Sequence, residues 1–336
     1  MTSPIRSLFP RTDVASPGAD RAVVRIAVDL LGGDKAPAAA VDGAVRACRA
    51  DPGLHLVLVG PRSSADEVLN LLPAADRSRV EVDVVDNVVG MADSPLRALR
   101  YDTTVRAAVA ALVDGRADAM VSAGASGAAV TAAVHGLGRV PSVRRPALAA
   151  TIPALTGPVV LLDLGAGTDA TMLDLLQHAV LGTAYAHLVE QVRAPRLGLL
   201  SIGSEPGKGD RLRRAVAIGL GELTLPAGAR YIGTVEGNDV PVGGPADVVV
   251  TDGFTGNVLL KGIEGAYALA SRSGGGSVSA PRAAVLLGVL GTVVVCHGAA
   301  SGPDVASGIG LAARLHRVDI SARLIAEAQD LPVEAP

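Results

Sequence analysis

Short apolar runs alternate with longer alanine-rich segments along most of this chain. The runs lie near Val24–Asp29, His55–Gly60, Val80–Val85, Asp118–Ser122, Ala147–Ile152, Val159–Leu164, Leu197–Ile202, Asp247–Thr251 and Val289–Cys296. Most are continuously apolar, which is typical of strands that are covered on both faces. Helices are expected between them, at Pro37–Arg49, Ser94–Asp114, Gly127–Gly138 and Thr171–Val192. This alternation predicts an α/β fold with a mostly parallel sheet and right-handed crossovers.

The length and composition set the size and content of the core. The chain has 336 residues, of which 49% are hydrophobic but only 2% aromatic, so the core must consist of Ala, Val, Leu and Ile. We expect residues 23–330 to form a single α/β domain, with a division into two lobes as the alternative. Residues 1–22 contain three prolines and no apolar segment, and they predict a disordered lead. The segment Ser271–Ser279 predicts a flexible linker.

Charge and cysteine content exclude several classes of protein. The 30 basic and 33 acidic residues nearly cancel, which argues against a nucleic-acid partner. The two cysteines, Cys48 and Cys296, exclude a disulfide framework and a cysteine-based zinc site. The longest apolar stretch, Ala283 to Cys296, is shorter than the roughly 20 residues of a membrane span. We therefore expect a cytoplasmic protein without a metal ion.

The loops that follow the predicted strands share one composition. Each combines Gly and other small residues with an acidic or hydroxyl side chain, and ligands bind at the carboxyl ends of parallel strands. The loops are Asp29–Pro37, Ser122–Gly127, Asp163–Asp169, Gly203–Asp210, Glu236–Asp239 and Asp252–Asn257. Together they predict a site for a phosphate-bearing ligand. The candidate binding residues are Asp29, Gly32, Gly33, Asp34, Ser122, Gly124, Ser126, Gly127, Asp163, Gly165, Glu205, Gly207, Glu236, Gly253, Gly256 and Asn257.

Three motif interpretations compete with this one. Gly165-x-Gly167-x-x-Ala170 matches a dinucleotide fingerprint, but the next predicted strand ends without the acidic residue that would bind a ribose. An NAD-dependent dehydrogenase is therefore a weaker alternative. Gly207-Lys208-Gly209 lacks the spacing of a nucleotide-binding P-loop, and Ser126 lacks the setting of a serine nucleophile.

Two further side chains are candidates for the chemistry. His297 directly follows the last predicted strand, and Lys261 lies four residues after Asn257, on the same face of a predicted helix. A lysine one turn into a helix at a strand end is placed to meet a phosphate.

Several strings of residues, in a fixed order, resemble one family. They are Asp29-x-x-Gly32-Gly33-Asp34-x-Ala36-Pro37, Met91-Ala92-Asp93-Ser94-Pro95, Ser122-Ala123-Gly124, Arg145-Pro146-Ala147-Leu148-Ala149, Gly207-Lys208-Gly209, Val235-Glu236-Gly237, the segment Ala246–Lys261, and His297-Gly298. The chain thereby resembles the PlsX-type phosphate acyltransferases from about Val24 to Leu315. Members of that family convert acyl-acyl carrier protein and inorganic phosphate into acyl phosphate, which supplies phospholipid synthesis.

The resemblance implies a Rossmann-like α/β/α sandwich of the isopropylmalate dehydrogenase-like type, a homodimer, and acyl transfer without a cofactor. Phosphate is itself the nucleophile and a thiolate is a good leaving group, so the protein must mainly position its substrates and stabilise charge. We expect Lys208 and Lys261 to contact phosphate or the oxyanion, with Asp252 and His297 as further catalytic residues. Asp34, Asp163 and Asp252 would orient amides and lysines.

The chain also departs from the family pattern. Asn is usual in the family at the positions of Ala125 and Gly167, and at that of Ala300 or Ser301. A helical pair is reduced here to a short tip at 266–279, from which we expect loss of membrane association and a changed dimer. These differences leave two alternatives to the family activity, a phosphate acyltransferase of a specialised pathway and a weakened homologue that binds carrier protein.

Overall fold

The computed structural model describes residues 23–100, 102–205, 207–272 and 281–328. The predicted lead at 1–22 and most of the predicted linker lie outside the described residues. The first two residues of that linker, Ser271 and Arg272, end a helix instead. Among the described residues, no helix combines the length and the apolar character that a membrane span requires.

The described strands form one 11-stranded sheet in the order β3-β2-β1-β4-β11-β10-β5-β6-β9-β7-β8. Their bounds are β1 Val24–Asp29, β2 Leu54–Gly60, β3 Val80–Val84, β4 Ala119–Ser122, β5 Ala147–Ala154, β6 Gly157–Leu162, β7 Arg196–Leu200, β8 Arg230–Val235, β9 Val248–Val250, β10 Ala283–Leu287 and β11 Thr292–Cys296. Both outer parts of the sheet are parallel. The pairs β11–β10, β10–β5 and β5–β6 at its centre are antiparallel. The predicted α/β class and mostly parallel sheet are confirmed.

Two strands, β10 and β8, were not predicted from the sequence. The stretch Ala283 to Cys296 was expected to contain one strand, but it forms the antiparallel pair β10 and β11. Gly288, with a φ of +91°, allows the chain to leave β10 in a conformation that other residues rarely adopt. Strand β8 is the outer edge of the sheet, and its mixed composition carries no continuous apolar run.

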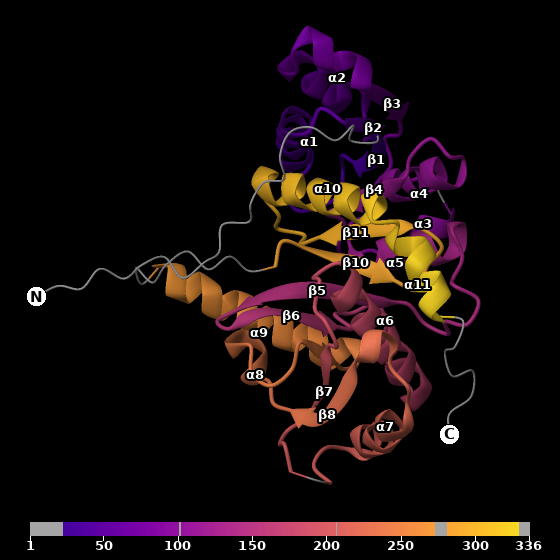
Figure 1. The fold of residues 1–336 in the computed structure, drawn as a ribbon. Helices are drawn as coiled ribbons and strands as arrows, with labels where there is room; N and C mark the ends of the chain where they lie inside the picture. Colours follow the sequence, from indigo (N-terminus) through magenta and orange to yellow (C-terminus); the bar gives the residue numbers. More distant parts are fainter. Residues whose placement is uncertain (1–22, 101, 206, 273–280, 329–336) are drawn as a thin grey trace, which may run out of the picture.

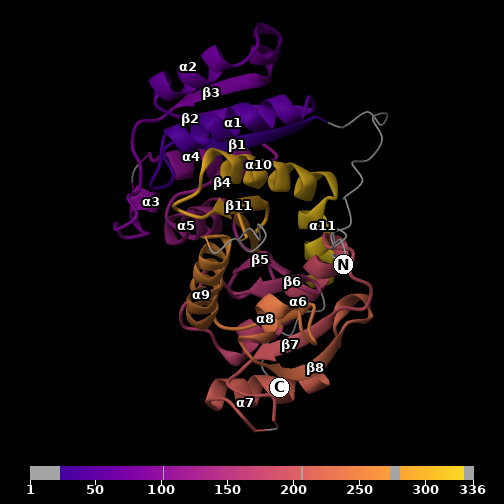
Figure 2. The same ribbon diagram turned by 90° about the vertical axis from the view of Figure 1, so that its left-hand side faces the viewer.

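Helices cover both faces of the sheet (Figures 1 and 2). The α-helices are α1 Ala38–Ala50, α2 Arg62–Leu71, α3 Arg97–Arg100, α4 Thr104–Val113, α5 Ser126–Gly136, α6 Met172–Leu188, α7 Arg211–Glu222, α8 Asp239–Val242, α9 Gly253–Arg272, α10 Gly302–Arg317 and α11 Ile320–Glu327. One buried cluster lies against α1, α6, α10 and α11, and a second lies against α4, α5 and α9. Both clusters consist of aliphatic side chains with very few aromatic ones, as the composition predicted.

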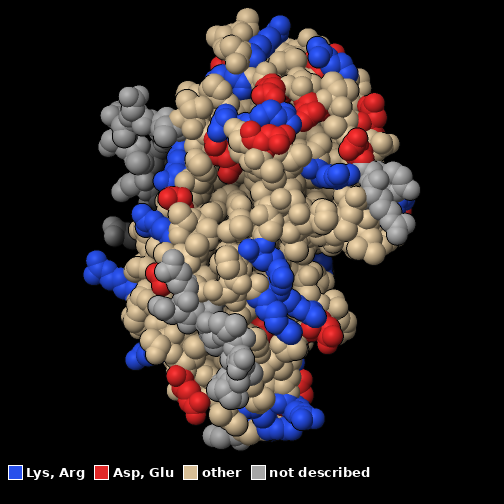
Figure 3. All heavy atoms as spheres, turned by 90° about the vertical axis from the view of Figure 1, so that its right-hand side faces the viewer, with Lys and Arg blue, Asp and Glu red and all other residues tan. Residues whose placement is uncertain are grey.

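The helix predicted at Ser94–Asp114 is two helices, α3 and α4. The amide of Thr104, the first residue of α4, donates to the carbonyl of Asn87 instead of to a helical acceptor. The face of the molecule in Figure 3 carries basic and acidic side chains in small groups among uncharged ones.

Candidate active site

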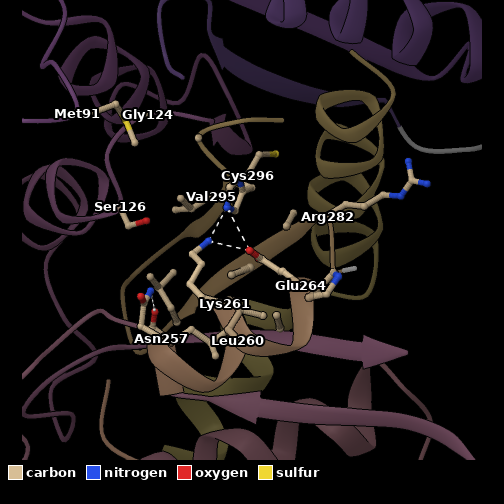
Figure 4. Close-up of a pocket in the computed structure, with 18 of the residues that line it drawn as sticks. Met91, Gly124, Ser126, Asn257, Leu260, Lys261, Glu264, Arg282, Val295 and Cys296 are labelled. Atoms are coloured by element: carbon tan, nitrogen blue, oxygen red, sulfur yellow. Dashed lines mark hydrogen bonds and ion pairs between the residues drawn. The ribbon is translucent and has the colours of Figure 1, made fainter. Parts of the chain in front are cut away.

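A cavity of about 330 Å³ lies between α5 and α9, over the central strands β5, β10 and β11 (Figure 4). Its polar lining comes from the ends of several strands. Asp34 follows β1, Ser126 follows β4, His297 follows β11, and Asn257 and Lys261 lie on α9 after β9. The structure therefore brings together five predicted site residues that lie far apart in the sequence.

Three of the side chains in this cavity meet at one point. The ammonium of Lys261 lies 2.9 Å from Glu264 Oε2 and 2.5 Å from His297 Nε2, and that nitrogen lies 3.3 Å from the same carboxylate oxygen. The other ring nitrogen, Nδ1, accepts a hydrogen bond from the amide of Ala299 at 3.0 Å. With Nδ1 as the acceptor, Nε2 carries the ring proton, so it is placed to donate to Glu264 and not to accept from the ammonium of Lys261.

The loop between β4 and α5 presents the start of a helix to the cavity. The N-cap of α5 is Ala125, with φ −55° and ψ 122°, and it has no side chain that could accept a hydrogen bond from the first turn. The first amides of a helix have no acceptor within the helix, which leaves those of Ser126 and Gly127 without a helical partner. Ser126 is exposed and, like Gly124, lines the cavity.

Two consecutive hydrogen bonds hold this loop in place. The amide of Gly124 donates to Ser122 Oγ at 3.0 Å, and that hydroxyl donates to Asp29 Oδ2 at 2.7 Å. Burial raises the pKa of Asp29, although hydrogen bonds from Ser122 and the backbone partly oppose this. A Cβ on Gly32 would lie 2.6 Å from the Gly124 nitrogen, so this glycine allows the two loops to touch. Gly33 packs in the same way against Ala123 and Gly298. Asp29, Ser122, Gly32 and Gly33 therefore support the site and do not line it.

The loop after β6 differs from the prediction. The carboxylate of Asp163 accepts hydrogen bonds from the amides of Leu148, Gly165, Ala166 and Gly167, all at 2.9–3.0 Å. The amides that were expected to hold an anion are therefore occupied by the protein's own carboxylate. The same contacts take the amides of the dinucleotide-like fingerprint, which further weakens the dehydrogenase alternative. Asp163 orients amides as predicted, but no described contact joins it to a lysine.

Asp252 has a partner other than the predicted lysine. Its carboxylate accepts from the amide and the hydroxyl of Thr255, in the first turn of α9, and it pairs with the guanidinium of Arg213 from α7. Burial alone would raise the pKa of Asp252, but these hydrogen bonds and the charge of Arg213 lower it below its ordinary value. Asp252 therefore caps α9 and does not line the cavity.

The start of α9 is packed tightly against the loop after β6. A Cβ on Gly256 would lie 1.9 Å from the carbonyl oxygen of Asp163, and one on Gly253 would lie 2.3 Å from that of Gly167. The side-chain amide of Asn257 donates to the carbonyl of Leu164 at 3.0 Å, beside Gly165. These predicted residues fix the position of α9, and through it that of Lys261.

The loops after β7 and β8 lie away from the cavity. Glu205, Gly207, Lys208 and Glu236 are exposed and do not line it. The structure separates Lys208 from the Lys261 cluster, and a catalytic role for Lys208 stays a prediction without a contact to support it.

Sequence reasoning missed two charged residues that line the cavity, Glu264 and Arg282. Glu264 lies three residues after Lys261, so helical spacing could have placed it on the same face. Arg282 pairs with Asp304 at 3.1 Å, and both line an adjoining cavity of about 240 Å³. Within 23–328, apart from the gaps named above, no three His, Cys, Asp or Glu side chains gather in a way that could hold a metal ion.

Comparison with known sequences places this chain in a family. The sequence profile of the family described as "Fatty acid synthesis protein" matches residues 24–273. A phosphate acyltransferase of Anaeromyxobacter sp. (strain K) is 39% identical over 94% of this chain and 93% of its own. That of Heliobacterium modesticaldum is 36% identical over 91% of this chain and 97% of its own. That of Bacillus subtilis is 41% identical over 72% and 71%.

Solved structures share the fold. A phosphotransacetylase from Streptococcus pyogenes superposes with a TM-score of 0.57 at 16% identity, over 91% of this chain and 94% of its own. A branched-chain phosphotransacylase from Enterococcus faecalis superposes with a TM-score of 0.57 at 15% identity, over 87% and 99%. On the strength of the sequence matches, which cover nearly the whole chain, this protein belongs to the phosphate acyltransferase family of fatty acid synthesis proteins.

Proposed function

We propose that this chain transfers an acyl group from the thioester of acyl carrier protein to inorganic phosphate, and so forms acyl phosphate for lipid synthesis. One observation carries the proposal. The uncapped start of α5 and the ammonium of Lys261 both line one cavity that also has an apolar wall. An anion and an aliphatic group can therefore occupy it side by side.

Phosphate binds at the polar end of the cavity. The amides of Ser126 and Gly127, the Ser126 hydroxyl and the Lys261 ammonium supply donors and positive charge for its oxygens. Glu264 holds the lysine in place from the other side. Because an anion at a helix start is favoured by the aligned peptide dipoles, α5 adds to the attraction.

The reaction then needs few groups with tuned pKa values. A phosphate oxygen attacks the thioester carbonyl carbon, and the carbonyl oxygen takes up negative charge beside Lys261. When the intermediate collapses, the carbon–sulfur bond breaks and the sulfur leaves as a thiolate, which is a stable anion because a free thiol has a pKa of about 8.5. Positioning the two reactants can lower the barrier by about 7–11 kcal/mol.

Replacement of Lys261 tests the proposal. We expect Lys261→Ala to lower turnover more than tenfold, because it removes the charge that faces both phosphate and oxyanion, while the thermal midpoint barely changes. Acyl phosphate trapped as hydroxamate from acyl-acyl carrier protein and phosphate measures the activity. Lys208→Ala, measured in the same assay, decides between the two lysines, because Lys208 lies outside the cavity and this proposal gives it no part in the reaction.

Three outcomes would contradict the proposal. Full activity of Lys261→Ala would remove this lysine from the mechanism, and loss of activity in Lys208→Ala alone would move the site to the loop after β7. Carrier-protein binding by the unaltered chain without any acyl phosphate would instead favour a non-catalytic homologue.

We also propose that the protein works as a homodimer in the cytoplasm, without stable attachment to membranes. In support, α9 carries exposed apolar side chains on one face, with Phe254 64%, Val258 59% and Leu269 67% exposed. A second copy would cover such a stripe. Sedimentation of the unaltered chain and of Leu269→Glu tests the dimer, which fails if both sediment as the same monomer. Co-flotation with anionic vesicles would contradict the absence of membrane attachment.

A further inference from the structure

A second, much smaller cavity adjoins the loop between β4 and α5. Its volume is about 10 Å³, and Gly124 lines both this cavity and the active-site cavity. Ala125, the N-cap of α5, lines the smaller one as well. The other lining residues are Asp29, Val88, Val89, Thr104, Val105, Ser122 and Ala128. The loop therefore contributes to the walls of both cavities.

The smaller cavity contains a hydroxyl that forms no hydrogen bond. Thr104, the first residue of α4, is fully buried, and its Oγ1 has no hydrogen-bond partner among the described residues. Leaving a buried hydroxyl unpaired is costly, so native structures pair such groups with protein atoms or with water. The Thr104 hydroxyl therefore points to a ligand in this cavity.

Asp29 supplies an acceptor in the same cavity. Its Oδ2 accepts from Ser122 Oγ at 2.7 Å, and its Oδ1 accepts from the amide of Leu31 at 3.1 Å. Burial raises the pKa of Asp29, and the hydroxyls of Ser122 and Thr104 oppose that shift, which places the Thr104 hydroxyl close to this carboxyl. A carboxylate has about four acceptor positions, so Asp29 can accept a further hydrogen bond.

The size and the lining of the cavity both suit one water molecule. A volume of about 10 Å³ is near the roughly 10–15 Å³ that holds a single water, and such a water needs roughly two to four polar partners. Thr104 can donate a hydrogen bond to it, and Asp29 can accept one from it. The buried side chains of Val89, Val105 and Ala128 complete the wall and leave no room for a larger ligand.

We infer that this cavity binds one water molecule between the Thr104 hydroxyl and the Asp29 carboxyl, and that Thr104 is thereby a positioning residue for the start of α5. Asp29 holds Ser122, and Ser122 holds the amide of Gly124, so the water extends these hydrogen bonds to α4. The positioning role rests on the proposed function, because phosphate is the ligand proposed for the first amides of α5. Thr104 does not line the active-site cavity, so it acts on phosphate only through the loop.

Replacement of Thr104 tests the inference. Thr104→Val keeps the branched shape of the side chain and removes the hydroxyl. The thermal midpoint should fall by about 2 °C, because the water and Asp29 lose a partner. The KM for phosphate should rise several-fold, whereas the KM for the carrier-protein thioester should not change. Thr104→Ser keeps the hydroxyl and should restore the KM for phosphate.

Thr103→Val is the matched control. Thr103 is also buried, and its Oγ1 likewise has no partner within the described part of the chain, but it does not line the cavity. Removing a hydroxyl that binds nothing does not cost stability, so Thr103→Val should keep both the thermal midpoint and the KM for phosphate. Equal behaviour of the two valine variants would overturn the inference.

A high-resolution crystal structure of the unaltered chain tests the water directly. A water within hydrogen-bond distance of Thr104 Oγ1 and of the Asp29 carboxyl would support the inference, and a direct hydrogen bond between the two side chains would overturn it. A bound water together with an unchanged KM for phosphate in Thr104→Val would overturn the positioning role.

The outcomes also separate this inference from the proposed function. If the unaltered chain forms no acyl phosphate from any thioester, the proposed function fails, while the crystal structure still decides the water. A titration with inorganic phosphate then decides the positioning role. Weaker binding by Thr104→Val than by Thr103→Val supports it, and equal binding overturns it.

Discussion

Two glycine-rich loops of this protein look alike in sequence and differ in what their amides do. The loop Ser122–Gly127 follows β4, and the loop Asp163–Asp169 follows β6. In the second, three amides of the loop, and a fourth from Leu148 of β5, are occupied by the buried carboxylate of Asp163, which is 1% exposed. In the first, Ala125 leaves the start of α5 without a side-chain cap, and Ser126 faces a cavity.

The difference shows that glycine content alone does not make an anion site. Backbone amides that are buried must find an acceptor, and a carboxylate within the loop satisfies them as well as a ligand would. The loop after β6 therefore holds the fold together, whereas no side chain of its own loop caps the start of α5, after β4. What distinguishes the two loops is whether an acidic side chain turns back onto the loop amides, as that of Asp163 does.

The largest effect is expected from removing the carboxylate that fills the second loop. Asp163→Ala leaves four amides without their acceptor, and we expect the free energy of unfolding to fall by about 3–5 kcal/mol. Asp163→Asn keeps one acceptor oxygen and should lose roughly half as much. Chemical denaturation of the variants measures both values.

Asp169→Ala is the control for this series. It removes an exposed carboxylate from the same loop, and it should change the free energy of unfolding by no more than about 0.5 kcal/mol. If Asp163→Ala were as stable as the control, the four hydrogen bonds would contribute nothing and the contrast between the loops would vanish.

Much of the fold could be predicted from the sequence, because continuous apolar runs report burial on both faces directly. The runs near Val24 and Leu197 became β1 and β7 with nearly the expected bounds. The pair β10 and β11 was not resolved in the same way, since the stretch contains two glycines and the sequence does not show at which of them the chain reverses. The structure places the reversal between Leu287 and Thr292, with Gly288 at a positive φ.

The residues that line the cavity were predictable in part, but their contacts were not. Strand-end position correctly selected Ser126, Lys261 and His297 as neighbours, because the carboxyl ends of parallel strands share one edge. The same argument selected Lys208, which the structure places elsewhere. Partners such as Arg213 for Asp252 depend on the packing of α7 against α9, which no local pattern encodes.

A substitution at Ala125 has the smallest expected effect on stability, and it tests the difference between the two loops most directly. Ala125→Asp supplies the first loop with a carboxylate of its own, at an N-cap whose extended backbone suits one. The cap should stabilise the fold by about 1 kcal/mol. It should also raise the KM for phosphate several-fold, because the amides are then occupied and the added charge repels the substrate. Thermal unfolding and phosphate titration measure the two effects.

Ala125→Ser separates occupancy of the amides from charge. A serine caps the helix without a negative charge, so it should give a similar gain in stability with a smaller rise in the KM for phosphate. If Ala125→Asp gains stability but binds phosphate as well as the unaltered chain does, the amides of α5 face some other ligand. Phosphate would then depend on Lys261 and Ser126 alone, and the two loops would differ only in how they satisfy their own backbone.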